Sequence, residues 1–339
     1  MAEQETRGAA ALNSNGEQRE TRTPRIIVQG GAYTLGGLNV FRQQFLDGIR
    51  EAAKVGYARL VTDNGTAVDA VEAAVCYLED NPYFNAGYGS FLTEKKEVEC
   101  DAMIMDGKKM SAGAVITVSH FRHPVSLSRK IMDESSHCAL SGEGALEFAR
   151  SKNFPTLEDP NELKAPTSLN MVIQHHNFDK FVEYHYAGKP MIDSNNEGHD
   201  TVSAVALDAN GNFACAASTG GIPGKLKGRV GDVPMIGCGG YANEYGAATT
   251  TGHGERLMKM TLAREVVYNM ERERSAQISA EEALSRMFNR VEGHGGVIAI
   301  DKNGEFGKSF NTDVMIWATV KDGELNYGLD NNNNFTENL

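Results

Sequence analysis

The chain has 339 residues, 41% of them hydrophobic and 23% charged, so it can bury a substantial core. Its formal net charge of -12 opposes the counterion release that draws proteins to nucleic acid. No run of about 18 apolar residues predicts a membrane span, and residues 1–24 lack the apolar core of a secretory signal. We expect a cytoplasmic protein with a disordered tail over residues 1–24, five reduced cysteines and a small-molecule or peptide substrate.

The first elements of the chain predict a strand followed by two helices. RIIVQGGA (residues 25–32) is a β-branched run that meets Gly30 and Gly31, which predicts a buried strand ending in a glycine turn. Apolar residues at helical spacing predict a helix beginning near Phe41. A second helix is predicted over residues 67–80, before a proline.

The middle of the chain mixes both kinds of element. Strand-like stretches cover residues 97–105 and 112–118, and helical stretches cover 126–135 and 142–150. Residues 153–200 contain several prolines and little periodicity, so we expect a flexible connecting segment there.

The C-terminal part begins with a strand at Thr201. Turn dipeptides join short apolar runs and predict hairpins at three places: Asn210-Gly211, Asn303-Gly304 and Asp322-Gly323. Helices are predicted over residues 255–272 and 279–290. The whole pattern favours an α+β fold of layered helices and mostly antiparallel sheets.

One threonine stands in an unusual position. In GHDTVSAVALD, Thr201 lies between a polar run and an apolar strand. A cut between Asp200 and Thr201 would give Thr201 a free α-amino group, whose reference pKa of roughly 7.7 to 8.0 suits a general base near neutral pH. The alternative is that Thr201 simply begins a strand after a polar loop.

Two downstream stretches carry groups that suit an amino-acid substrate. The loop STGGIPGKLKGRVGD ends with Arg229 and Asp232, which could bind a carboxylate and an ammonium; the alternative is a surface ion pair. TTTGHGE opens a predicted helix, where Thr251, Gly252 and Gly254 could hold an oxyanion; the alternative is an ordinary helix cap.

Taken together, the motifs GHDTV, STGG, GRVGD, TTGHGE, FNAGYGS and DAMIMDG resemble the plant-type asparaginase and isoaspartyl peptidase family of N-terminal nucleophile hydrolases, over residues 26–328. The resemblance implies a four-layer αββα sandwich in one catalytic domain, residues 25–339. It also implies self-cleavage into an α subunit (1–200) and a β subunit (201–339), which stay together and pair as a homodimer of αβ units.

The resemblance implies catalytic roles as well. Thr201 would be the nucleophile, and Thr219 would orient its hydroxyl and amine. Thr251 and Gly252, with Asn85 of FNAGYGS, would stabilise the oxyanion. The reaction implied is hydrolysis of the side-chain amide of L-asparagine and of β-aspartyl peptides, with release of L-aspartate and no cofactor for catalysis.

Substrate and ion contacts follow from the same resemblance. Arg229 and the Gly254 amide would bind the substrate carboxylate, and Asp232 with the Gly252 carbonyl would bind its ammonium, so that the aspartyl amine and carboxylate must be free. A structural Na⁺ would be held by six backbone carbonyls, those of Leu78, Glu79, Asn81, Phe84, Ala86 and Tyr88.

Three positions depart from the usual family pattern. Gln29 stands where many relatives have His, and Ser203 stands where Gly is common. Asp200 is shared with the glycosylasparaginase branch, which makes a glycosylasparagine amidase the alternative within the class. A precursor that never cleaves and only binds Asp-like ligands is the alternative outside it.

Overall fold

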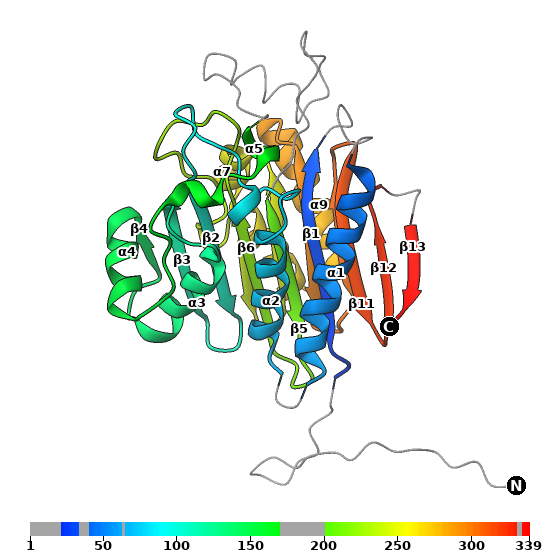
Figure 1. Ribbon diagram of the computed structural model, residues 1–339. Coiled ribbons are helices and arrows are strands. Elements are labelled where there is room, and N and C mark those ends of the chain that lie inside the picture. The colour runs from blue at the N-terminus through cyan, green and yellow to red at the C-terminus, as the bar shows by residue number, and fades with distance from the viewer. Residues whose placement is uncertain (1–21, 34–40, 63–64, 170–200, 331–333) are drawn as a thin grey trace, which may run out of the picture.

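The computed structural model describes residues 22–33, 41–62, 65–169, 201–330 and 334–339. Its larger sheet has nine strands (Figure 1). In spatial order these are β13 (Asn334–Asn338), β12 (Glu324–Gly328), β11 (Val314–Lys321), β1 (Arg25–Tyr33), β5 (Val202–Leu207), β6 (Phe213–Thr219), β2 (Cys100–Asp106), β3 (Ser111–Val118) and β4 (Ala139–Ser141).

The smaller sheet has four antiparallel strands. Their order is β10 (Phe306–Phe310), β9 (Gly295–Asp301), β8 (Gly246–Gly252) and β7 (Gly240–Asn243). The two sheets face each other, and β8 and β9 contact β1 and β5 across the interface.

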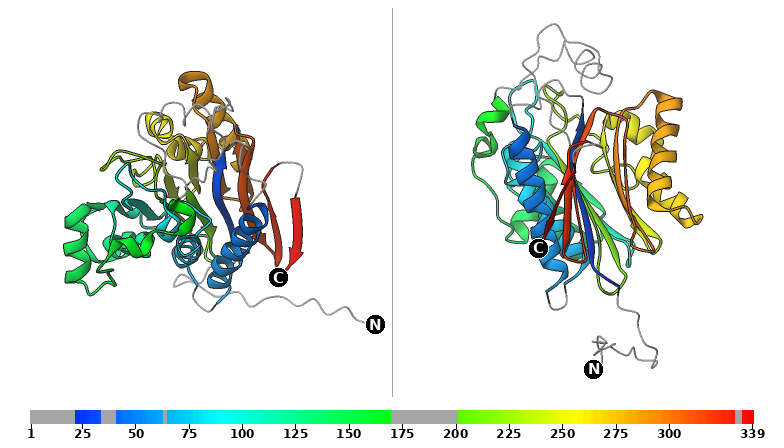
Figure 2. Two further views of the ribbon diagram at one scale, coloured as in Figure 1. Left: turned by 45° about the horizontal axis from the view of Figure 1, so that its top comes forward. Right: turned by 90° about the vertical axis from the view of Figure 1, so that its right-hand side faces the viewer.

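Helices cover the outer face of each sheet, so that four layers are visible in the right-hand view of Figure 2. The larger sheet carries α1 (Arg42–Leu60), α2 (Ala67–Glu79) and α3 (Pro124–Glu134). The smaller sheet carries α7 (Gly254–Met260), α8 (Leu262–Glu271) and α9 (Ala276–Val291). Shorter elements complete the N-terminal half: η1 (Gly87–Gly89), α4 (Gly142–Ser151), η2 (Pro160–Leu163) and α5 (Pro166–Leu169).

Three apolar clusters fill the spaces between the four layers. Alternation along β5 shows how one strand serves two of them: Val202 and Ala204 belong to the cluster under α1 to α3, whereas Val205 and Leu207 belong to the cluster between the sheets. The third cluster lies between the smaller sheet and helices α8 and α9. The predicted αββα sandwich is therefore confirmed.

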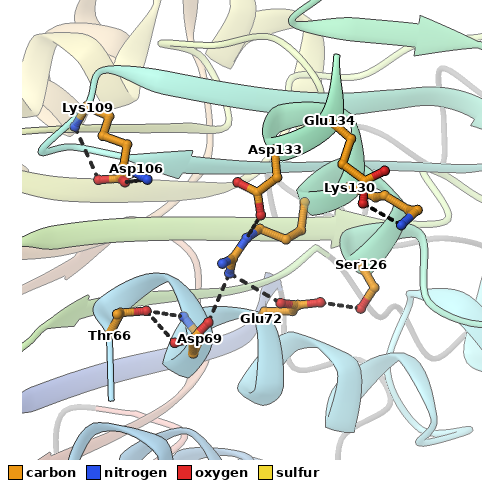
Figure 3. Close-up of polar contacts among 10 residues, drawn as sticks. Thr66, Asp69, Glu72, Asp106, Lys109, Ser126, Lys130, Asp133 and Glu134 are labelled. Carbon is orange, nitrogen blue, oxygen red and sulfur yellow. Dashed lines mark hydrogen bonds and ion pairs between the residues drawn. The ribbon is translucent and has the colours of Figure 1, made fainter. Parts of the chain in front are cut away.

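Local sequence explains how the outer helices begin and stay in place. The hydroxyl of Thr66 accepts a hydrogen bond from the Asp69 amide and caps α2. On the outer surface, α2 and α3 are joined by polar contacts (Figure 3). There Arg129 of α3 pairs with Asp69 and Glu72 of α2, at 3.1 Å and 3.5 Å. These contacts lie on the outer side of the larger sheet, which the helices cover. They therefore do not line the space between the two sheets.

The three predicted hairpins are confirmed. Gly211, Gly304 and Gly323 all have positive φ, between 76° and 77°, and join β5 to β6, β9 to β10 and β11 to β12. No helix within the described ranges combines the length and apolar character needed to cross a membrane.

Other predicted boundaries were wrong. The first strand does not end at its glycines; β1 continues to Tyr33 through a bulge, where its register with β11 shifts between Gln29 and Ala32. The helix expected over residues 255–272 is two helices, because Thr261 adopts the left-handed conformation at φ 47°. The start of the first of these helices agrees with the prediction, because α7 begins at Gly254, and Thr251 lies in strand β8 before it.

The connecting segment predicted over residues 153–200 begins with ordered structure. η2 and α5 lie within it, and the side chains of Leu163 and Ala165 are buried. Its remainder, residues 170–200, lies outside the described residues.

Candidate active site

Thr201 lies at the N-terminal end of β5, in the larger of the two sheets. It immediately precedes β5 and is 2% exposed. Because side chains alternate along a strand, Thr201 points the same way as Val205 and Leu207, toward the smaller sheet. Asp200, the other side of the predicted cleavage site, lies outside the described residues.

Thr219 lies beside Thr201 at the end of the neighbouring strand. The antiparallel register pairs Val202 with Ser218, so the next position outward sets Thr201 next to Thr219. The Thr219 hydroxyl accepts a hydrogen bond of 2.9 Å from the Gly221 amide, which shapes the turn that leaves β6. The structure thus brings these two predicted residues together.

Asn85 reaches the same turn from the loop after α2. Its Nδ2 donates to the Gly221 carbonyl at 2.6 Å, and its Oδ1 accepts from the Phe91 amide at 2.9 Å. The Gly220 amide donates to the Asn85 carbonyl at 3.0 Å. Asn85 is fully buried, so these bonds fix its orientation beside the turn.

Thr251 approaches from the smaller sheet. It is fully buried near the end of β8, and its side chain points into the space between the sheets, as that of Ala247 does. Its Oγ1 has no hydrogen-bond partner among the described residues. A buried hydroxyl without a partner costs stability, which is expected where a group is kept for a ligand.

Gly252 follows with φ 129°, a conformation that favours glycine. A Cβ there would lie 2.5 Å from both the His294 carbonyl oxygen and the Gly295 Cα, so a side chain has no room. The backbone can therefore turn sharply between Thr251 and the helix that begins at Gly254.

Arg229, Asp232 and Gly254 converge on one side of this turn. A Cβ at Gly254 would lie 2.9 Å from Nη2 of Arg229 and 3.0 Å from Oδ1 of Asp232. Asp232 is 3% exposed, and its Oδ2 lies 3.2 Å from the Thr250 hydroxyl. Arg229 is also largely buried, with 15% of its side chain exposed.

A partner of Arg229 is Glu255, which was not among the residues that the sequence motifs predicted for the site. Nε and Nη2 of Arg229 donate to the two carboxylate oxygens of Glu255, each at 3.0 Å. Burial raises the pKa of Glu255, but the Arg229 guanidinium and the accompanying hydrogen bonds hold it below its ordinary value. An acidic residue in the first turn after TTTGHG was the available signal.

Lys225 and Asp101 are two further buried residues that the sequence did not predict for the site. Lys225 is fully buried, and its Nζ donates to the Glu99 carbonyl at 2.8 Å. Burial lowers the pKa of Lys225 and raises that of Asp101, while each charge partly offsets the effect on the other. Asp101 also lies opposite Thr219 in the register between β2 and β6. Lys225 and Asp101 therefore both lie close to the turn that follows β6.

The loop after α2 brings several predicted ion ligands together. A Cβ at Gly87 would lie 2.5 Å from the Glu79 carbonyl oxygen, and one at Gly89 would lie 2.9 Å from that of Asn81 and closer still to that of Phe84. Carbonyl oxygens gathered around glycines suit a hard cation such as Na⁺. Carbonyls of Leu78, Asn81, Phe84 and Ala86 also accept amide hydrogen bonds within the loop, which use one lone pair each.

Comparison with known proteins places the chain in a family. The family described as Asparaginase matches residues 22–329. The chain is 42% identical over 316 residues to the isoaspartyl peptidase/L-asparaginase of Danio rerio, with 93% of this chain and 97% of the relative covered. It is 43% identical over 309 residues to the protein of the same name from Homo sapiens, with 91% and 96% covered. With this match along nearly its whole length, the chain belongs to the asparaginase family.

Proposed function

We propose that this protein is a self-activating threonine hydrolase that cleaves the side-chain amide of L-asparagine and of β-aspartyl peptides and releases L-aspartate. The observation that carries the proposal is the pairing of Thr201 with Thr219 at the ends of adjacent strands that face β8, where the buried Thr251 hydroxyl has no partner among the described residues. The names of the relatives, isoaspartyl peptidase/L-asparaginase, support the same substrates.

Activation is a single cut before Thr201. The Thr201 hydroxyl attacks the Asp200 carbonyl carbon, the bond to the Thr201 nitrogen breaks, and the acyl group becomes an ester while the amine is freed. Water then hydrolyses the ester and leaves a new N-terminus at Thr201 and a new carboxylate at Asp200. The product has a hydroxyl and an α-amine on one residue.

Turnover uses this pair as nucleophile and base. The amine takes the hydroxyl proton as Oγ1 attacks the side-chain carbonyl carbon of the substrate, and it returns that proton to the leaving nitrogen. Ammonia or the peptide amine departs, and an aspartyl ester remains on Thr201. Water hydrolyses the ester, which regenerates the hydroxyl and releases L-aspartate. Thr219, adjacent to Thr201 in the sheet, keeps the hydroxyl and amine oriented.

The negative charge that develops on the substrate oxygen needs donors already in place. The Thr251 hydroxyl and the Asn85 amide are the proposed donors, with Gly252 shaping the turn beside them. Thr251 Oγ1 is buried without a partner in the described part of the chain, which supports this role, because no bond to those residues must break before it donates. One such donor is typically worth about 3 kcal/mol of transition-state stabilisation.

Substrate selection comes from Arg229 and Asp232. Glu255 holds Nε and Nη2 of Arg229, and Nη1 lies on the side of Gly221 and Gly231. In our proposal, the guanidinium and the Gly254 amide bind the α-carboxylate, and Asp232 and the Gly252 carbonyl bind the α-ammonium. An ordinary α-peptide bond would occupy that carboxylate, so general proteolysis is disfavoured.

The remaining parts of the proposal concern ion binding, cellular compartment and assembly. The carbonyls of the loop after α2 would hold a structural Na⁺ that keeps Asn85 in place. All five cysteines are free, which supports a reducing compartment such as the cytoplasm. Pairing of αβ units into a dimer is the expected assembly, and light scattering of the mature protein measures it.

Mass analysis of purified protein tests the function directly. We expect fragments that correspond to residues 1–200 and 201–339, and we expect aspartate release from L-asparagine and from a β-aspartyl dipeptide. Thr201→Ala should give one intact chain and no aspartate. An intact wild-type chain without turnover would instead favour a binding protein, and turnover confined to N4-glycosyl-asparagine would favour the glycosylasparaginase alternative.

A further inference from the structure

Three buried polar side chains form a hydrogen-bonded chain below the candidate site. Nε2 of Gln29 in β1 donates to the Ser203 hydroxyl in β5 at 2.8 Å. The Ser203 hydroxyl lies 2.6 Å from that of Thr249 in β8. All three residues are completely buried, and the last contact crosses from the nine-stranded sheet to the four-stranded one.

The direction of this chain is set at its Gln29 end. Oε1 of Gln29 accepts from the Gly31 amide at 2.6 Å, so the oxygen is on that side and Nε2 faces Ser203. Since Ser203 Oγ accepts from Gln29, its own proton is available to Thr249 Oγ1. Gln29 also fastens the bulge of β1 through the Gly31 amide.

These hydroxyls lie beside the apolar cluster between the sheets. Thr249 is paired with Ile298 across the smaller sheet, and the apolar cluster between the sheets continues below with Val205 and Met315. A hydroxyl in apolar surroundings without a hydrogen bond carries a desolvation cost. The contact between Ser203 and Thr249 therefore joins β5 directly to β8 through a hydrogen bond between two buried side chains.

The same two strands carry the reacting groups. Ser203 follows Thr201 by two positions on the same face of β5, and Thr249 precedes Thr251 by two positions on the same face of β8. Two residues of strand span only about 6.6 Å, so a change in strand separation at the hydroxyl pair reaches the site almost undiminished.

We propose that Gln29, Ser203 and Thr249 form a positioning clamp that sets the separation between the Thr201 nucleophile and the Thr251 oxyanion donor. None of the three touches substrate; each acts through the strand it belongs to. The clamp rests on the proposed function, because it positions the groups to which that function assigns the chemistry.

The clamp predicts a specific kinetic change. Ser203→Ala and Thr249→Val each remove one hydroxyl, and each should lower kcat per cleaved chain by about 10- to 100-fold, because misplacement of reacting groups by a fraction of an ångström to 1 Å is costly. KM should stay within about threefold, since none of the three clamp residues is among the groups proposed to bind the substrate. The double variant should be no slower than the slower single, since both remove the same contact.

Two further variants separate positioning from simple damage to the core. Thr249→Ser keeps the hydroxyl and should retain kcat within about threefold of wild type. Ser128→Ala removes another fully buried serine hydroxyl, one that donates to the Pro124 carbonyl in α3, and should lower the melting temperature without lowering kcat. Should Ser203→Ala fail to fold, Thr249→Val and Thr249→Ser decide the same question from the other strand.

The outcomes distinguish the two proposals. An active wild type together with Ser203→Ala and Thr249→Val that turn over within twofold of it overturns the clamp alone, as would full additivity in the double variant. A wild type that releases no aspartate overturns the clamp and the proposed function together. A fall in kcat at nearly constant KM, with rescue by Thr249→Ser, supports the clamp.

Discussion

Thr250 and Thr251 are neighbours on β8, yet their hydroxyls are in opposite situations. Thr250 Oγ1 donates to the Cys238 carbonyl at 2.8 Å and lies 3.2 Å from Oδ2 of Asp232, whereas Thr251 Oγ1 has no partner among the described residues. At the scale of a single residue, the bonded hydroxyl of Thr250 contributes to stability, whereas the hydroxyl of Thr251 is available to a ligand.

Thr251→Val should lower kcat by about 100-fold or more, because one oxyanion donor is lost. It should leave stability unchanged or raise it by up to about 1 kcal/mol, because a buried hydroxyl without a partner disappears. Steady-state kinetics and urea unfolding measure the two effects, the latter in a Thr201→Ala background that keeps one chain. Thr250→Val is the matched control, and its free energy of unfolding should fall by about 1 kcal/mol. A similar fall in Thr251→Val would contradict the assignment of Thr251 as a donor without an internal partner.

His253, between Gly252 and Gly254, should make the stability of the folded protein depend on pH. Burial, with smaller contributions from nearby cations, lowers the pKa of His253 from its ordinary value of 6.5 to about 4. The unfolded chain therefore binds a proton at a pH where the folded protein does not. Stability should fall as the pH drops from about 6.5 to about 4, by at most about 3 kcal/mol from this residue, and should not depend on His253 above that range.

Urea unfolding of the Thr201→Ala chain across this pH range, with and without His253→Asn, measures the effect. The variant should lack the part of the slope that His253 contributes, because Asn does not titrate and still suits the start of a helix. Equal slopes in the two proteins would show that His253 is protonated equally in the folded and unfolded states.

At the scale of elements, β1, α1 and the loop carrying Asn85 meet around Phe84. Phe84 is fully buried and contacts Phe45 of α1 edge to face, with ring centroids 5.9 Å apart. A Cβ at Gly30 would lie 2.9 Å from Cδ1 of Phe84, and a Cβ at Gly48 would lie 3.0 Å from its Cζ, with closer approaches to the same ring. Both glycines thus make room for the residue next to Asn85.

Gly48→Ala should destabilise the protein by about 1 to 3 kcal/mol, because the added methyl overpacks Phe84. It should also lower kcat, since the shift of Phe84 moves Asn85. Gly144→Ala in α4 is the control: nothing lies within 4 Å of its Cβ position, and alanine should stabilise the helix by up to about 1 kcal/mol. Thermal unfolding and kinetics on both variants decide whether crowding or helix propensity dominates at Gly48.

At the scale of the whole molecule, the two proposed subunits are interleaved rather than adjacent. β1, from residues before the cut, lies between β11 and β5, which come from residues after it; β2 likewise pairs with β6. Backbone hydrogen bonds and the apolar clusters on both faces of the larger sheet hold the pieces together. A cut at one end of β5 removes none of these contacts.

The cleaved fragments should therefore copurify under native conditions and separate only in denaturant. Residues 1–200 and 201–339 expressed separately should each fail to fold, because each would expose unpaired strand edges and half of a core. Size exclusion with denaturing electrophoresis of the peak checks the first statement, and circular dichroism of the separate pieces checks the second. Independent folding of either piece would contradict the interleaved arrangement.

Much of the fold was accessible from local patterns. Helical spacing predicted α1, α2 and α9, and turn dipeptides predicted three hairpins, since both signals depend on residues only a few positions apart. Boundaries at glycines were predicted poorly, because a glycine can end a strand or form a bulge, and neighbouring strands decide which. In β1, pairing with β11 on the far side of Ala32 carries the strand onward.

In the site, too, some features were predicted from the sequence and others were not. Motifs marked Thr201, Arg229 and Asp232 as candidates without a structure, but the pairing of Arg229 with Glu255 and of Gln29 with Ser203 was not predicted. The second pair joins residues 174 positions apart. Gln29 and Ser203 were noticed only as separate departures from a familiar pattern, and their contact follows from the side-by-side pairing of β1 with β5.

The sequence by itself determined which residue types stand in which order, where most helices and hairpins form, and which threonine is suited to become a nucleophile. Only the tertiary structure decided which groups share the space between the sheets, because strand order and register bring together residues whose separation along the chain carries no information about distance. Hydroxyls that look alike in the sequence thus acquire different partners, and their burial and partners set what each can do.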